Sequence, residues 1–202
     1  SVNAVKKITK QYTENESTET QEKNTSTQNK TTKKPNVIAI MNESFADLAM
    51  SYNMELSDDP LEFYHELITR DNVVSGVMHS SQFGGGTANV EYECITQNAT
   101  AFLPSGAMPY QQYISGKIKQ SMVAYMNRLG YTTYGIHSWE KSGYSREKVY
   151  KFLGFDHSFF KEDMNNLQFM RNGYSSDQST YEVYYNVMNN KPDGDKNFSF
   201  IV

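Results

Sequence analysis

Three short strand-like runs constrain the fold of this chain more than any other feature. They cover residues 36–41, 131–137 and 198–202 and are rich in β-branched or aromatic residues. Such continuous runs are typical of strands buried on both faces of a parallel sheet. Helix-like segments separate them, and the order of strand, helix and strand indicates βαβ units. The sequence therefore predicts an α/β fold with a mostly parallel sheet flanked by helices.

The helix-like segments are recognised from the spacing of their apolar residues and from their stop signals. Helices are predicted at residues 60–70, 118–129, 146–153 and 175–188. Another short helix is predicted after Thr87, with Val90, Cys94 and Ile95 facing inward. Residues 73–78 are predicted to form a further strand, and residues 155–170 are predicted to be irregular.

A glycine-rich stretch, Ser80–Glu93, leads into that short helix. Its three consecutive glycines, residues 84–86, can take positive φ and can approach a ligand closely. Thr87 follows them, at the point where a helix would offer N–H groups and a positive dipole end to an anion. Thr87 is therefore a candidate helix cap, phosphate ligand or covalent nucleophile, and the residues alone leave these three readings open.

Other functional side chains follow two of the strand-like runs. Glu43 comes just after the first run, and His137 ends the second. Open α/β sheets bind ligands at the carboxyl ends of their strands. The loop after His137 carries Trp139, Tyr144 and Arg146, and an arginine suits a planar fork to phosphate. This loop is thus a candidate binding site for a phosphorylated alcohol.

Composition limits the classes of partner and site. The net charge of −4 gives no electrostatic reason to expect nucleic-acid binding, and a single cysteine excludes an intrachain disulfide or a cysteine-based metal cluster. Residues 1–34 are dominated by polar side chains, which predicts a disordered linker ahead of a domain at residues 35–202. No apolar run approaches the ~18 residues that span a bilayer, so the chain as given is expected to be soluble.

Six segments, taken together and in order, resemble one family. They are residues 35–45, 84–93, 129–131, 136–137, 144–146 and 153–156. Over roughly residues 34–202 the chain resembles the lipoteichoic acid synthase and phosphoglycerol transferase family of the sulfatase/alkaline phosphatase superfamily.

The resemblance implies a membrane-anchored metalloenzyme on the extracytoplasmic face of a bacterial membrane. Such enzymes transfer glycerol phosphate from phosphatidylglycerol to a polyglycerol-phosphate or glycan acceptor, using a threonine nucleophile and Mn²⁺ or Mg²⁺. By position, Thr87 corresponds to the nucleophile, which also touches the metal, and Glu43 to a metal ligand. His137 and Arg146 correspond to residues that bind the glycerol-phosphate group.

Two further residues of the loop depart from the pattern of the family. Tyr144 lies where some relatives carry Trp, and Trp139 lies where some carry Asp. Both are candidate substrate-binding residues, and these departures leave their roles and the fine specificity for the acceptor open.

The chain stops in a predicted strand, before the Asp-His pair that completes the metal site in this family. We therefore expect a catalytic domain truncated at its C-terminal side, without the upstream membrane helices. Because Glu43 and Thr87 supply only two ligands, this piece is expected to bind metal poorly and to be inactive alone.

Four alternatives come from related and unrelated classes. A sulfatase needs a Cys or Ser nucleophile followed by Pro and Arg, and the segment Thr87–Glu91 has neither of these two residues. Phosphoethanolamine transferases use threonine but tend to carry several disulfides. A non-catalytic binding or regulatory module with the same fold, or another phospho- or sulfo-ester hydrolase of the superfamily, stays open.

Overall fold

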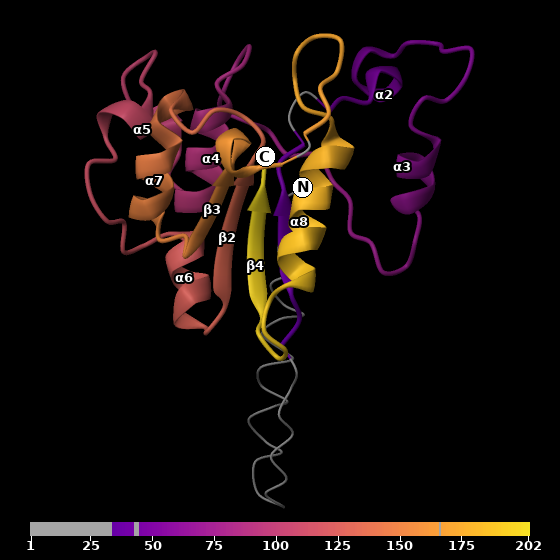
Figure 1. The fold of residues 1–202 in the computed structure, drawn as a ribbon. Coiled ribbons are helices and arrows are strands. Elements are labelled where there is room, and N and C mark those ends of the chain that lie inside the picture. Colours follow the sequence, from indigo (N-terminus) through magenta and orange to yellow (C-terminus); the bar gives the residue numbers. More distant parts are fainter. Residues whose placement is uncertain (1–33, 43–44, 166) are drawn as a thin grey trace, which may run out of the picture. The chain divides into compact units, whose positions relative to one another are not determined.

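The computed structural model describes residues 34–42, 45–165 and 167–202. A four-stranded sheet lies at the centre of the described domain (Figure 1). Its strands are β1 (Val37–Ile40), β2 (Thr132–His137), β3 (His157–Phe160) and β4 (Asn197–Ile201). They are arranged in the order β1-β4-β2-β3, and every neighbouring pair is parallel. The predicted α/β fold with a parallel sheet is confirmed.

Seven α-helices connect and cover these strands in the described part of the chain. They are α2 (Leu48–Tyr52), α3 (Glu62–Leu67), α4 (Thr87–Thr96), α5 (Pro109–Gln112), α6 (Met122–Arg128), α7 (Arg146–Leu153) and α8 (Asp177–Asn189). Short 3₁₀ turns lie at Thr100–Phe102, Gly143–Ser145 and Lys161–Asp163. No helix among the described residues is long and apolar enough to cross a bilayer.

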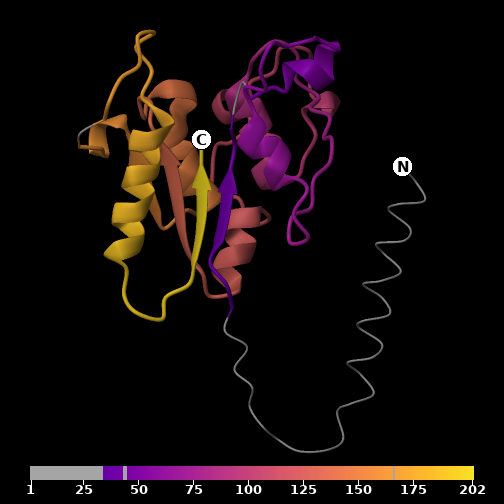
Figure 2. The same ribbon diagram turned by 90° about the vertical axis from the view of Figure 1, so that its right-hand side faces the viewer.

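The two faces of the sheet carry separate cores. Helices α4, α6 and α7 pack on one face, where Tyr150, Phe198 and Phe200 are almost completely buried. Helix α8 packs on the other face, over Ile136 and Ile201. Figure 2 shows α8 and α6 on opposite sides of the sheet. This layering follows from the alternation of side chains along each strand.

Strand β2 lies unusually close to helix α7 at Gly135. A Cβ atom at this position would lie 2.7 Å from Cδ2 of Tyr150 and 2.8 Å from its Cε2. The Tyr150 side chain is fully buried, so its ring has no room to withdraw. Glycine at residue 135 therefore permits the close approach of this helix to the sheet.

Two secondary-structure predictions are wrong. Residues 73–78 form no strand, and Val74 is 99% exposed, because the segment has no strand partner among the described residues. The segment predicted to be irregular contains strand β3, which pairs with β2. Pairing with a neighbouring strand supplies the order that this short run does not encode locally.

Two burial predictions also require correction. Strand β1 was expected to be buried on both faces, but Ile38 and Ile40 are 47% and 52% exposed. Within the described residues β1 is an edge strand that pairs only with β4, so alternate side chains stay uncovered. Of the three residues predicted to face inward from α4, Ile95 is buried, Val90 is half-buried and Cys94 is exposed. The buried residues of α4 are Ala88, Asn89, Glu91, Ile95 and Thr96.

The prediction of a disordered linker at residues 1–34 concerns residues that lie, apart from Lys34, outside the described part of the chain. It stays a prediction.

Candidate active site

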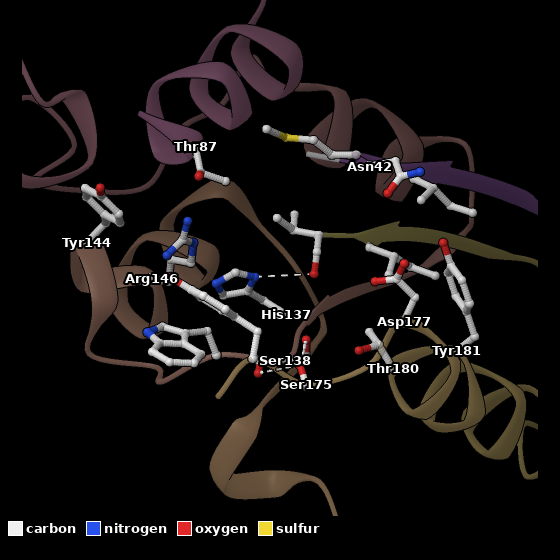
Figure 3. Close-up of a pocket in the computed structure, with 16 residues that line it drawn as sticks. Asn42, Thr87, His137, Ser138, Tyr144, Arg146, Ser175, Asp177, Thr180 and Tyr181 are labelled. Carbon is white, nitrogen blue, oxygen red and sulfur yellow. Dashed lines mark hydrogen bonds between the residues drawn. The ribbon is translucent and has the colours of Figure 1, made fainter. Parts of the chain in front are cut away.

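A pocket of about 420 Å³ lies at the carboxyl ends of β1, β2 and β4. Helices α4, α7 and α8 begin at the same edge of the sheet, so both strand ends and helix starts contribute side chains (Figure 3). The lining residues are Ile40, Met41, Asn42, Thr87, His137, Ser138, Trp139, Tyr144, Arg146, Tyr174, Ser175, Asp177, Thr180, Tyr181, Ile201 and Val202. This is the place where open parallel sheets bind ligands.

Thr87 enters the pocket as the first residue of α4. The N-cap of that helix is Gly86, at φ 88° and ψ 43°, and Gly84 and Gly85 also have positive φ. Only glycine takes this conformation readily, so the glycine run delivers the chain to the helix start without strain. The cap position therefore belongs to Gly86, and Thr87 is placed on the wall of the pocket. Its roles as nucleophile and metal ligand stay predictions.

Arg146 begins α7, and its side chain is only 2% exposed. Its Nε and Nη2 donate to Oε1 of Glu91 at 3.0 and 2.5 Å. Burial works against the charge of this guanidinium, but the hydrogen bonds and charge of Glu91 raise the pKa of Arg146. One edge of the guanidinium is thus committed to Glu91, and the residue still lines the pocket.

His137 ends strand β2 with its ring in the pocket. Burial and the nearby charge of Arg146 lower its pKa to about 4, so the ring is neutral at neutral pH. Its Nδ1 lies 3.4 Å from the carbonyl oxygen of Val202. A carbonyl only accepts, so in this contact Nδ1 donates and Nε2 carries the lone pair. His137 therefore offers its Nε2 as a hydrogen-bond acceptor.

The two aromatic residues of the loop each face a cation. The ring of Tyr144 lies 5.1 Å from Cζ of Arg146, and the ring of Trp139 lies 4.9 Å from Nζ of Lys161. Tyr144 and Ser145 both have left-handed backbone conformations, at φ 53° and 60°. Non-glycine residues rarely adopt this region, and such strain is often found in functional loops.

The structure thus brings five of the predicted site residues into one pocket. They are Thr87, His137, Trp139, Tyr144 and Arg146. The remaining one, Glu43, lies outside the described residues, although its neighbour Asn42 lines the pocket.

Sequence reasoning missed the part of the pocket that α8 contributes. Asp177, Thr180 and Tyr181 lie there, and Ser175 bonds Ser138 between their Oγ atoms at 2.6 Å. The helix predicted to begin at residue 175 was a usable signal, because the first turn of a helix that follows a parallel strand faces the carboxyl edge. Glu91 was missed as well, since nothing in the sequence marks it as buried.

A divalent metal needs more ligands than this part of the chain brings together. Among the residues that the structure describes, no three His, Cys, Asp or Glu side chains form a group that could hold a metal ion. The Thr87 hydroxyl alone does not make a site for Mn²⁺ or Mg²⁺. The described residues therefore do not by themselves fit the expected metal.

A family comparison covers most of the chain. A family model described as sulfatase matches residues 35–202. A protein of Rhizobium meliloti (strain 1021) that is named for cyclic β-1,2-glucan modification is 39% identical over 146 residues. That alignment covers 72% of this chain and 22% of the relative.

Two solved structures have a similar fold. One is the phosphoglycerol transferase GacH of Streptococcus pyogenes, in complex with sn-glycerol-1-phosphate, with 22% identity and a TM-score of 0.68. The other is the lipoteichoic acid synthase LtaP of Listeria monocytogenes, with 20% identity and a TM-score of 0.69. The matches cover 84% and 83% of this chain, and 44% and 40% of the two structures. The chain therefore spans less than half the length of these proteins.

Proposed function

Because this chain belongs to the sulfatase family, we propose that the protein containing it transfers glycerol phosphate from the headgroup of phosphatidylglycerol to a polymer or glycan acceptor. One observation carries the proposal: Thr87, His137 and Arg146 come from distant parts of the sequence and line one pocket. Further support comes from the similar fold of two proteins whose names refer to phosphoglycerol transfer and lipoteichoic acid synthesis.

The proposed reaction has two steps. In the first, Oγ of Thr87 bonds to phosphorus and loses its proton, and the bond from phosphorus to the diacylglycerol oxygen breaks. Diacylglycerol leaves with a proton on that oxygen. In the second step an acceptor hydroxyl attacks the glycerophospho-threonine, and Oγ of Thr87 leaves and is protonated again. The intermediate divides one difficult displacement into two.

In this proposal the other pocket residues bind different groups of the substrate. Arg146 is a pure donor and suits the phosphate oxygens. Neutral His137 has an acceptor at Nε2, which suits a hydroxyl donor such as a glycerol hydroxyl rather than a phosphate oxygen. We assign the walls of the same site to Tyr144 and Trp139.

The proposal extends to a divalent metal, Mn²⁺ or Mg²⁺, with Glu43 and Thr87 among its ligands. Such an ion supplies charge stabilisation to a transferring phosphoryl group. Since the described residues do not form a complete ligand set, the steps above depend only on the chain's own side chains. The proposed location is the extracytoplasmic face of a bacterial membrane.

The test uses the full-length protein, with Mn²⁺ or Mg²⁺, on vesicles that contain labelled phosphatidylglycerol. We expect wild type to release diacylglycerol, and Thr87→Ala to release none while keeping its circular dichroism spectrum. Thr69→Ala is the matched control, because the Thr69 hydroxyl donates to the carbonyl oxygen of Glu66 and the residue is not among those that line the pocket. Mass spectrometry should detect a glycerophosphoryl group on the peptide that contains Thr87. Equal release by wild type and Thr87→Ala would remove Thr87 from the mechanism, and the absence of release from all three proteins would refute this donor.

A further inference from the structure

A buried carboxylate lies behind the pocket and is not one of its lining residues. Glu91 is on α4, four residues after Thr87, and has no exposed surface. Besides Arg146, it accepts hydrogen bonds from the hydroxyl groups of two buried tyrosines. Tyr150 donates to its Oε2 at 3.0 Å, and the Tyr110 hydroxyl lies 3.3 Å from the same oxygen. These groups come from α4, α5 and α7.

The hydrogen bonds and the charge of Arg146 favour the ionised form of Glu91 in this arrangement. Burial raises its pKa, and the hydrogen bonds and charge of Arg146 oppose that effect. Arginine keeps its proton in proteins and has no acceptor, so both contacts from Nε and Nη2 need an accepting oxygen on Glu91, and a negative charge there strengthens them. A carboxylate with N–H and O–H donors on both oxygens is therefore the form that satisfies the network.

The ion pair decides which edge of Arg146 is available to a substrate. Nε and Nη2 form the side-on edge of the guanidinium, and this edge faces Glu91. Nη1 lies on the other side, 3.4 Å from the carbonyl oxygen of Gly143, and the ring of Tyr144 covers one face of the group. The Nη1 end of Arg146 is therefore the part of the guanidinium that Glu91 leaves for a phosphate in the pocket.

The pair also connects the two helices that carry the reacting groups. Residues four apart in an α-helix lie on the same face, about 6 Å apart along the axis. Thr87 and Glu91 therefore move together as parts of α4, and Arg146 is held to Glu91 from the first turn of α7. Any displacement of the guanidinium relative to Thr87 has to break this pair.

We propose that Glu91 is a positioning residue, which fixes the Nη1 end of Arg146 relative to the Thr87 hydroxyl for phosphate binding. The expected effect of Glu91 on turnover rests on the proposed function. The fixed position of the Arg146 guanidinium rests on the contacts alone. The alternative to a positioning role is a purely structural one. In that case the ion pair would contribute to stability, and a variant that folds without it would keep its turnover.

The first experiment uses the 202-residue chain and does not depend on activity. In a ¹H–¹⁵N spectrum the Nε–H signal of Arg146, assigned with Arg146→Lys, should exchange slowly with water because this proton is buried and bonded. We expect Glu91→Gln to speed this exchange by at least about tenfold. Glu147→Gln is the matched control, because it removes the same charge beside Arg146 from an exposed pair with Lys151. Unchanged exchange in Glu91→Gln would overturn the proposal.

The second experiment measures lipid cleavage by the full-length protein. Glu91→Gln should lower kcat by at least about tenfold with little change in KM, since a small misplacement of a binding group mainly affects the transition state. Glu147→Gln should keep the wild-type kcat. Equal losses in both variants, or none in either, would overturn the positioning role.

Tyr150→Phe keeps the experiment decisive if Glu91→Gln fails to fold. This variant removes one hydrogen bond to Glu91 and leaves the charges of Glu91 and Arg146 in place. Its kcat should therefore fall less than that of Glu91→Gln, and an unchanged kcat would contradict the proposal. If wild type cleaves no lipid, the proposed function fails, and the exchange measurement still decides whether Glu91 fixes Arg146.

Discussion

The close contact between Gly135 and Tyr150 gives a sharp test of how β2 and α7 pack. Gly135→Ala would place a methyl group 2.7 Å from Cδ2 of Tyr150, well inside van der Waals contact. The ring is fully buried and also touches Phe155 and Phe160, so it cannot turn aside without moving its neighbours. Overpacking of this kind costs about 1–3 kcal/mol.

We therefore expect Gly135→Ala to lower the free energy of unfolding by about 2 kcal/mol. For a chain of this size that is a fall in Tm of about 4–8 °C. The assay is thermal and urea unfolding followed by far-ultraviolet circular dichroism. Gly116→Ala is the matched control, because a Cβ there would meet nothing within 4 Å and its φ is not positive.

A double variant identifies the atoms responsible. Tyr150→Ala removes the ring carbons that the new methyl group would meet, so Gly135→Ala should cost much less in that background. If Gly135→Ala and Gly116→Ala unfolded at the same temperature, the close packing of β2 against α7 would be refuted. An equal cost of Gly135→Ala with and without Tyr150 would show that the ring is not the cause.

Two further predictions concern stability. His137 has a pKa of about 4 in the folded chain and takes up its proton near pH 6.5 when unfolded. The free energy of unfolding should therefore fall by up to about 3 kcal/mol as pH falls from 6.5 to 4. Urea titrations of His137→Asn should lack this part of the pH dependence, and identical pH profiles of the variant and wild type would contradict the prediction. Ser121 caps α6 by accepting from the Ala124 N–H and donates to the Leu153 carbonyl, both at 3.0 Å. Ser121→Ala should therefore lower the free energy of unfolding, measured by thermal unfolding, by about 1–2 kcal/mol. Ser115→Ala, at an exposed position, should change it little. Equal effects of the two substitutions would argue against the cap.

The sequence predicted most of the fold because the relevant signals are local. The apolar run at 131–137 and the apolar spacing at 146–153 act through residues close in the chain, and β2 and α7 formed where expected. Strand β3 was not predicted, because its order comes from pairing with β2 over a distance in sequence. The exposure of β1 was missed for a similar reason, since burial depends on which strands lie beside it.

The candidate site was predictable only in part. The residues at strand ends and at the start of a helix, such as His137 and Thr87, share one edge of a parallel sheet, and this rule is accessible from the sequence. The partner of Arg146 could not be predicted from the sequence, because Glu91 lies 55 residues away. The residues around Glu91 also resemble those around an ordinary solvent-exposed carboxylate. Buried ion pairs depend on tertiary packing, which local spacing does not encode.

The left-handed conformations of Tyr144 and Ser145 lower thermal stability in the loop to which we assign substrate binding. Each costs about 1–2 kcal/mol in a residue with a Cβ, and glycine would relieve that cost. A laboratory selection for heat resistance alone would therefore favour glycine at position 144 and remove the ring that covers Arg146. If Tyr144 binds substrate as proposed, thermostable descendants of this chain would gain stability at the expense of substrate binding, and a selection that also requires turnover should retain the left-handed pair.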